Sequence, residues 1–308
     1  MSIRPVWAVL AQTFNNWSDD QAPRLGAALS YYTIFSLAPL LVIIVGIAGL
    51  VFDPNTVRTQ LNDQFRELMG PEGEQVISAM VAAGEKPQAG IIATIIGIAA
   101  LFLGATGVFI ELKSALNTIW RVRAKPGRSF WGFIRDYYLS FAMVLGIGFL
   151  LLVLLVISAG LSAVLAWLKT QFPLPDAATH ALDLFVSWLV VTMLFALIFK
   201  YLPDAIIRWR DVWLGAAATS VLFTLGKFLI GLYIGHASLS SSYGAAGTVL
   251  VVLVWSYYSA QILLLGAEFT RLQAQRFGGG IRPKSNAEFV DAATEVKELK
   301  SAVGHQQT

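Results

Sequence analysis

The chain has 308 residues, of which 56% are hydrophobic and only 13% are charged, with a formal net charge of +3. Soluble domains carry about 25% charged residues, so this composition excludes a disordered chain and argues against a soluble globular enzyme. The chain has no cysteine, which excludes disulfides, thiolate metal sites and a cysteine nucleophile.

Residues 1–24 precede the first long apolar run and contain an amphipathic pattern. Apolar side chains at helical spacing predict a helix over residues 5–17 that lies on the inner membrane surface and packs on the helix bundle. These side chains are Trp7, Leu10, Phe14 and Trp17. A regulatory membrane sensor is the alternative interpretation of this segment.

Long uncharged segments predict membrane-spanning helices, because a helix needs about 20 mostly apolar residues to cross a bilayer. Uncharged runs of 28, 24 and 32 residues follow Arg24, Lys86 and Asp136, whereas the run after Asp183 has only 16. The first run is too long for the apolar region of a secretory signal peptide. We predict one transmembrane domain over residues 25–268, with six spans at about 25–52, 88–110, 137–168, 181–200, 212–234 and 247–267.

Residues 53–89 form a long acidic loop after the first span. Apolar residues at spacings of four, four and three predict a helix that ends at Gly70 and Pro71 and caps the outer mouth of the bundle. These apolar residues are Val57, Leu61, Phe65 and Leu68.

The last predicted region is a cytoplasmic tail over residues 269–308. It carries three consecutive glycines, Gly278 to Gly280, followed by polar sequence. Glycine-rich stretches behave as flexible linkers, so we predict a flexible tail with at most one marginal helix, at about residues 287–300.

The basic residues are distributed unevenly between the two sides of the predicted bundle. Segments 1–24, 111–136, 200–211 and 268–308 hold 17 of the 22 Lys and Arg residues, whereas the alternate segments hold four. The positive-inside rule then places both termini in the cytoplasm, which agrees with an even number of spans. The predicted fold class is therefore all-α, a polytopic membrane protein with six transmembrane helices and additional amphipathic interfacial and outer-loop helices. Because the membrane topology accounts for the excess of Lys and Arg residues, we expect no nucleic-acid partner.

No sequence motif for catalysis is present. The chain lacks a zinc-binding His-x-x-x-His pair, a Walker A phosphate loop, a Gly-x-Ser-x-Gly elbow and a dinucleotide fingerprint. We therefore predict a protein that is not an enzyme, with no catalytic residue, no metal, no cofactor and no ATPase activity of its own.

Lys227 is the only basic residue well inside a predicted span. A lysine at a helix centre costs about 2.5–3.5 kcal/mol on insertion scales, so its ammonium group needs water or a partner. Two interpretations stay open. The side chain either extends toward the outer interface, where Asp183 lies, or lines a polar cavity that attracts an anionic group.

Two further segments are candidates for the wall of that cavity. The stretch 238–247 between the last two spans is uncharged and built of small residues, and such backbone enters a bilayer only where protein or water surrounds it. A short exposed turn is the alternative. Pro39 predicts a kink in the first span that is either structural or part of a gate. The candidate cavity and pathway residues are Lys227, Tyr243, Ser242, Gly244, Tyr31, Ser36 and Pro39.

Three motifs resemble the signatures of a known family. They are the segment from Arg24 to Leu40, RLGAALSYYTIFSLAPL, the segment from Ala115 to Trp120, ALNTIW, and the sixth-span set YGAAG, WSYY and GAE that begins at Tyr243 and ends at Glu268. Over about residues 10–275 the chain resembles the YihY / virulence factor BrkB family of bacterial inner-membrane proteins. The resemblance implies six spans but no settled activity, since members carry labels as different as ribonuclease, transporter and lipid flippase. The family-motif residues are Asn117, Trp120, Gly247, Trp255, Tyr258 and Glu268.

These observations favour a bacterial inner-membrane transporter or lipid flippase-like protein without its own ATPase. The alternative is a non-transporting membrane scaffold or envelope-integrity protein, and the absence of a nuclease core or metal cluster in the sequence argues against a ribonuclease. We expect membrane lipids and one solute or lipid substrate as partners, and an oligomer is compatible with the sequence. We further expect Glu268, at the end of the sixth span, to meet Arg271 and water at the inner interface.

Overall fold

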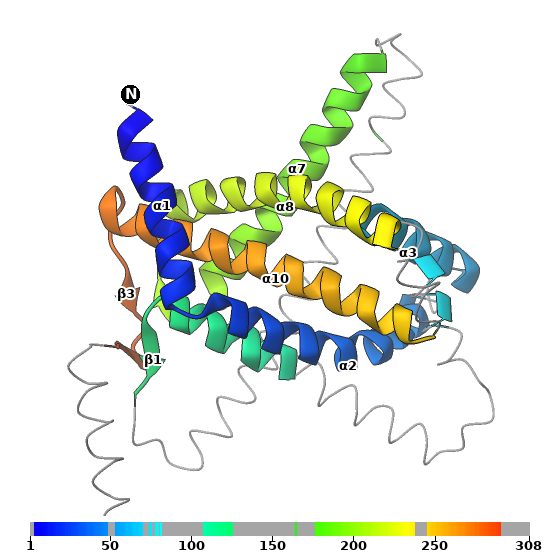
Figure 1. Ribbon diagram of the computed structural model, residues 1–308, viewed down its shortest axis with the longest axis horizontal. Helices are drawn as coiled ribbons and strands as arrows, with labels where there is room; N and C mark the ends of the chain where they lie inside the picture. Colours follow the sequence, from blue (N-terminus) through cyan, green and yellow to red (C-terminus); the bar gives the residue numbers. More distant parts are fainter. Residues whose placement is uncertain are drawn as a thin grey trace, which may run out of the picture.

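The computed structural model describes residues 3–48, 53–69, 107–125, 176–237 and 245–290, together with residues 74, 75, 78, 79, 81 and 164. The chain is mostly helical over these ranges, as predicted (Figure 1). The helices are α1 (Ile3–Asp19), α2 (Ala22–Ala48), α3 (Pro54–Met69), α7 (Asp176–Tyr201), α8 (Trp209–Ala237) and α10 (Ala245–Arg276), and residues 107–119 are also helical. The strands are β1 (Val122–Ala124), β2 (Ala205–Ile206), β3 (Arg282–Pro283) and β4 (Ala287–Phe289). These short strands, of two or three residues each, were not predicted.

Residues at the start of α2 and α3 favour helix initiation at these positions. Pro23 and Pro54 lie in the first turns of α2 and α3, where a missing backbone N–H costs no hydrogen bond. Asp53 caps α3, because its carboxylate accepts the backbone N–H of Thr56 at 3.1 Å. The helix predicted before Gly70 is therefore present.

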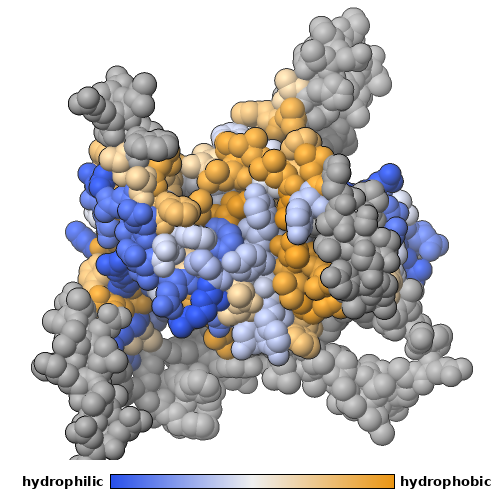
Figure 2. Space-filling view, viewed as in Figure 1, coloured by the Kyte–Doolittle hydropathy of each residue, from blue (hydrophilic) through white to orange (hydrophobic). Residues whose placement is uncertain are grey.

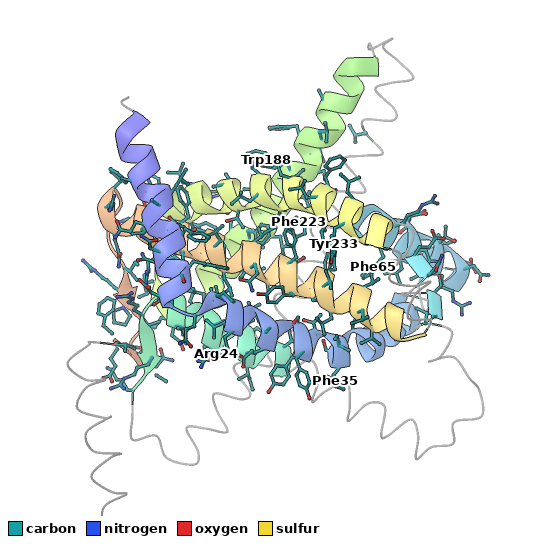
Figure 3. All side chains as sticks on the ribbon, viewed as in Figure 1. Arg24, Phe35, Phe65, Trp188, Phe223 and Tyr233 are labelled. Carbon is teal, nitrogen blue, oxygen red and sulfur yellow. The ribbon has the colours of Figure 1, made fainter. Side chains whose placement is uncertain are left out.

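The long helix α10 is the centre of the bundle and packs against α1, α2 and α8. It runs antiparallel to α8, and α7 crosses behind α8 in Figure 1. The ring of Phe223 on α8 packs edge-on against the ring of Phe195 on α7, with 5.6 Å between the ring centroids. Figure 3 shows Phe223 inside the bundle. Phe35, on the opposite side, points outward from α2. A second apolar cluster forms where Val57, Leu61 and Phe65 of α3 pack near Val251 and Val252 of α10.

Three helical segments among the described residues are long and apolar enough to cross a membrane: Leu184–Tyr201, Trp209–Tyr233 and Val249–Arg276. They coincide in position with the last three predicted spans, and α2 covers most of the first. The second and third predicted spans lie almost wholly outside the described residues, so the count of six spans and the orientation of the termini stay predictions. Large apolar side chains on α8, such as Phe228 at 66% and Leu229 at 60%, are exposed on the outside of the bundle. Figure 2 shows hydrophobic surface over this middle region, with hydrophilic surface at the ends near α1 and α3.

Two threonine–glycine pairs bring α8 and α10 into close contact. A Cβ added at Gly215 would overlap the Thr270 side chain, and one added at Gly266 would overlap Thr219. Each threonine hydroxyl donates to the carbonyl of the glycine one turn earlier in its own helix, at 2.7 Å for Thr219 and 2.6 Å for Thr270. Small residues of this kind let helix backbones approach closely in membrane bundles.

The C-terminal segment closes one end of the bundle. Strand β3 pairs antiparallel with β2, and β4 pairs antiparallel with β1. Helix α10 continues to Arg276, and Gly279 donates its backbone N–H to the Asp211 carboxylate at 3.3 Å. Residues 269–290 are therefore ordered, which corrects the prediction of a flexible tail over this part. Residues 291–308 lie outside the described residues.

Helix α1 is present where an interfacial helix was predicted, but a different face packs on the bundle. Val9 and Thr13 are buried, whereas Leu10 and Phe14 are 47% and 59% exposed. Helix α1 packs mainly against α10, and Trp17 is partly buried against the main apolar core, which includes Leu116, Trp120 and Phe199. The predicted apolar face is thus divided: Trp17 contacts protein, and Leu10 and Phe14 point outward.

Candidate functional site

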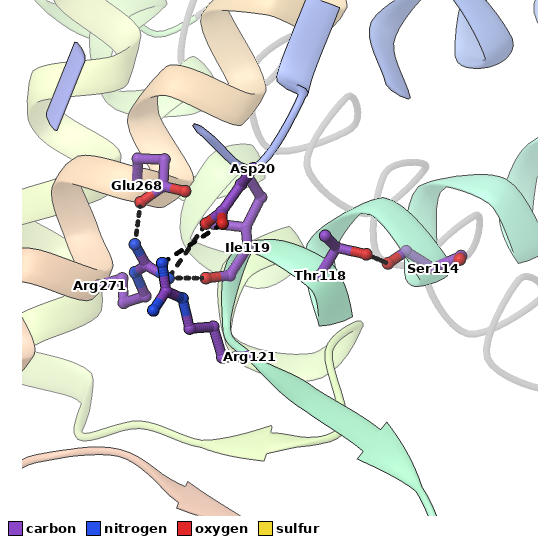
Figure 4. Close-up of polar contacts among 7 residues, drawn as sticks. All are labelled: Asp20, Ser114, Thr118, Ile119, Arg121, Glu268 and Arg271. Atoms are coloured by element: carbon purple, nitrogen blue, oxygen red, sulfur yellow. Dashed lines mark hydrogen bonds and ion pairs between the residues drawn. The ribbon is translucent and has the colours of Figure 1, made fainter. Parts of the chain in front are cut away.

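A cluster of charged side chains lies where three segments meet at the α1 end of the bundle. Asp20 is in the turn between α1 and α2, Arg121 follows the helical residues 107–119, and Glu268 and Arg271 are one turn apart on α10. Figure 4 shows these side chains converging. We call Asp20, Arg121, Glu268 and Arg271 the inner charge cluster.

Two unusual backbone conformations position this cluster. Gln21 and Arg121 both have a φ of 52°, in the left-handed region that non-glycine residues seldom adopt. At Gln21 this conformation turns the chain from α1 into α2, directly beside Asp20. At Arg121 it ends the helix, and the backbone N–H of Arg121 bonds to the Thr118 carbonyl at 3.0 Å. Strained residues of this kind gather at functional sites more than elsewhere.

Arg271 is the hub of the inner charge cluster. Its Nη2 lies 2.8 Å from Oε2 of Glu268, and its Nη1 lies 3.2 Å from Oδ2 of Asp20. The same Nη1 donates to the backbone carbonyl of Ile119 at 2.8 Å. Arg121 contacts the other Asp20 oxygen at 3.4 Å. One guanidinium thus holds α10, the α1–α2 turn and the end of the 107–119 helix together.

The inner charge cluster is deeply buried on the α10 side. Glu268 is 0% exposed and Arg271 is 2% exposed, whereas the Arg121 side chain is 55% exposed. Oxygen Oε1 of Glu268 has no hydrogen-bond partner in the described part of the chain. The prediction that Glu268 meets Arg271 is confirmed, but the prediction that it meets interfacial water is wrong, because its side chain is enclosed.

A second polar cluster fastens the 107–119 helix to the turn between α7 and α8. The Asn117 amide donates to the Asp204 carboxylate at 3.1 Å and accepts the backbone N–H of Asp204 at 2.8 Å. Lys113 pairs with the same carboxylate at 3.0 Å, and the backbone N–H of Lys284 bonds to the Asp204 carbonyl at 2.9 Å. Burial lowers the pKa of the Lys284 side chain below its ordinary value, although the nearby Asp204 carboxylate acts in the opposite direction.

The residues predicted to form a cavity are not brought together in the described structure. Lys227 is half-buried on α8, beside the closely packed contact of Gly226 with Tyr258. Tyr31 and Ser36 lie on α2, and α10 separates α2 from α8 in Figure 1. The Tyr31 ring is 58% exposed, while the buried Ser36 hydroxyl donates to the Thr33 carbonyl.

Part of the predicted cavity cannot be placed. Ser242, Tyr243 and Gly244 lie outside the described residues, and Pro39 lies within α2 with no described side-chain environment. The cavity around Lys227 therefore stays a prediction.

The family-motif residues occupy four different environments. Trp120 is buried in the main core, and Asn117 belongs to the second polar cluster. Trp255 and Tyr258 pack against the apolar cluster around Val251, where Gly247 is also buried. Glu268 alone lies in the inner charge cluster.

Sequence reasoning did not single out Asp20 or Arg121. The pairing of Glu268 with Arg271 follows from their spacing of three on one helix. Asp20 is 251 residues from Arg271 along the chain, and no local pattern signals such a contact. Among the described residues, no group of three or more His, Cys, Asp or Glu is arranged to hold a metal ion.

Comparison with known proteins places the chain in a family. The family model described as virulence factor BrkB matches residues 13–290. A "UPF0761 membrane protein" of Azotobacter vinelandii is 29% identical over 268 residues, covering 85% of this chain and 62% of that protein. A protein of the same name from Tolumonas auensis is 27% identical, covering 82% of this chain and 80% of its own length.

The chain thus spans less than two thirds of the Azotobacter relative. No solved structure matches the chain. With a matched family model over most of its length and apolar helices long enough to cross a bilayer, the chain is an integral membrane protein that belongs to the virulence factor BrkB family.

Proposed function

We propose that this protein transports a solute or a lipid across the bacterial inner membrane and has no ATPase or other enzymatic activity of its own. The observation that carries the proposal is the burial of Glu268 and Arg271 in α10, within the apolar segment Val249–Arg276. Ionisable groups in membrane helices are costly, and they mark substrate pathways, ion pathways and proton relays.

The geometry of the inner charge cluster suits a moving part. Arg271 contacts groups from the α1–α2 turn, from the end of the 107–119 helix and from its own helix. A change of charge at one of these groups therefore changes the strength of contacts that join all three segments. Switching transitions in proteins are commonly driven by such local changes at packed interfaces.

A membrane scaffold is the second candidate function. The close contacts of Gly215 with Thr270 and of Gly266 with Thr219 favour it, because they fasten α8 to α10 along one seam. A scaffold needs a rigid bundle, whereas a transporter needs at least one interface that changes.

The transport proposal is tested with purified protein in liposomes of bacterial phospholipid. One set of vesicles carries NBD-labelled phosphatidylethanolamine or phosphatidylglycerol, and dithionite added outside measures lipid movement. Another set is challenged with organic anions, amino acids and sugars while charge movement is recorded on a supported membrane. We expect one of these measurements to exceed that of protein-free vesicles and to fall in the variant Glu268→Gln. Asp63→Asn, which changes an exposed carboxylate on α3, is the matched control.

The same vesicles test the predicted cavity. If Lys227 attracts an anionic substrate, Lys227→Met inserts normally and loses transport, while Lys227→Arg keeps part of it. Full transport by Lys227→Met would end the cavity hypothesis and leave the interfacial interpretation. No transport of any probe by well-folded protein would contradict the transport proposal and support the scaffold.

A further inference from the structure

We propose that Glu268 is a proton-binding site that alternates between a carboxylate paired with Arg271 and a neutral carboxylic acid. This inference deepens the transport proposal and rests on it only for the use of the proton as a coupling ion. The binding site itself follows from the inner charge cluster.

The first argument is the environment of the Glu268 carboxyl group. It is fully buried, and of its two oxygens only Oε2 is paired, with Arg271. Oxygen Oε1 lacks a hydrogen-bond donor among the described residues. A buried polar atom left without a partner costs free energy, and a proton on the carboxyl group removes the charge that makes this burial expensive.

The second argument is the position of Asp20. Its carboxylate and that of Glu268 both contact the guanidinium of Arg271, Asp20 at 3.2 Å and Glu268 at 2.8 Å. Two carboxylates held at one site repel each other, and a proton on one of them removes that repulsion. Of the two, Glu268 is the more deeply buried at 0% exposed, whereas the Asp20 side chain is 14% exposed and also contacts Arg121, so the charge on Glu268 is the more expensive one to keep.

The third argument is that Arg271 stays satisfied when Glu268 is neutral. Its Nη1 keeps Asp20 and the Ile119 carbonyl as partners. With Glu268 ionised, two carboxylates share one buried guanidinium, and the second guanidinium, Arg121, is mostly exposed. With Glu268 protonated, Asp20 and Arg271 form a balanced pair. The step transfers one proton from hydronium in the solvent to a carboxylate oxygen, which forms one O–H bond, breaks another and leaves a water molecule.

The charged groups around Glu268 in the described structure are Arg271 on its own helix, Asp20 in the α1–α2 turn and Arg121 beyond the 107–119 helix. On α8, the uncharged Gly215 and Thr219 contact Thr270 and Gly266 of α10, and the buried Asp211 lies near Gly278 and Gly279, beyond the end of α10. Asp20, with part of its side chain exposed, is the described group through which a proton from solvent reaches Glu268. Protonation of Glu268 weakens its ion pair with Arg271 on the same helix. The ion pair between Arg271 and Asp20 in the α1–α2 turn stays intact.

Infrared spectroscopy on the full chain in lipid nanodiscs tests this proposal. At about pH 7.5, exposed Asp and Glu side chains are ionised and give no carboxylic-acid carbonyl band. We expect the wild-type protein to show such a band, to lose it on titration to more alkaline pH, and to shift it when the protein is labelled with ¹³C-glutamate. The band should be lost in Glu268→Gln and kept in the control Asp63→Asn.

Isotope labelling keeps the test valid if Glu268→Gln does not fold, because it needs only wild-type protein. Absence of a glutamate band in the wild type at neutral pH, or its persistence in folded Glu268→Gln, would overturn the proposal. The spectroscopic result does not depend on transport. A titrating band without transport of any probe would leave the proton site standing and refute the proposed function, whereas transport without the band would do the reverse.

Discussion

Asn117 shows how a single amide connects distant parts of this chain. Its side chain both donates to and accepts from Asp204, 87 residues away, in a turn whose carboxylate is buried beside Lys113. A carboxamide carries a donor and an acceptor side by side on one planar group, which suits both contacts. The residue therefore joins the 107–119 helix to the α7–α8 turn by two hydrogen bonds.

Replacing Asn117 by aspartate should weaken this connection between the 107–119 helix and the α7–α8 turn. The variant loses the donor to Asp204 and places a second negative charge against a buried carboxylate, so we expect destabilisation of about 2 kcal/mol or more. The melting midpoint in detergent measures the effect. Asn55→Asp, at an exposed position in the first turn of α3, makes the same chemical change and should stay within about 0.5 kcal/mol of the wild type. Equal midpoints for both variants would contradict this account of Asn117.

The sequence alone identifies some of the residues in the two polar clusters as candidates, but it does not identify their partners. Asn117 and Glu268 are marked by motif, and Arg271 is within reach of Glu268 on the same helix. Asp204 and Asp20 come from turns far away along the chain, and their burial depends on packing that no local pattern encodes. Residue types suggest chemistry, but tertiary contacts decide which charges meet.

The helices of this protein were predictable because long apolar runs and amphipathic repeats extend over many residues. Helices α7, α8 and α10 contain the last three predicted spans, and α3 ends before Gly70 as expected. The strands were not predictable, because β2 and β3 have two residues each and show no alternation. The glycines before β3 suggested a linker, whereas in the structure Gly279 bonds to the Asp211 carboxylate.

The seam between α8 and α10 makes a prediction about glycine. Gly215→Ala places a methyl group against Thr270, so the two helices must separate, at a cost of about 1–3 kcal/mol. Gly231→Ala lies on the same helix with open space around it and should be neutral or stabilising by up to about 1 kcal/mol. Melting midpoints of the two variants check the difference. A variant at Gly215 as stable as one at Gly231 would show that the seam is not closely packed in the membrane.

At the scale of the whole molecule, the orientation in the membrane is open to direct test. The chain has no cysteine, so single cysteines at Glu72 and Ser301, both outside the described residues, are unique labels. From the positive-inside distribution we expect an impermeant thiol reagent to label Glu72→Cys in intact cells and to spare Ser301→Cys until the membrane is opened. The reverse pattern would invert the predicted topology.

The strand pairs at the end of the bundle also constrain how the protein is made. Strand β4 pairs with β1 across 165 residues, as at Arg123 and Glu288, and β3 completes the pair with β2. Neither pair can form until residues 282–289 have left the ribosome, after all the described helices have been synthesised. Strands β3 and β4 therefore fasten helices that were made before them. A nascent chain released before residues 282–289 would display the open edges of β1 and β2, a feature by which cellular quality control could distinguish it from a chain that contains them.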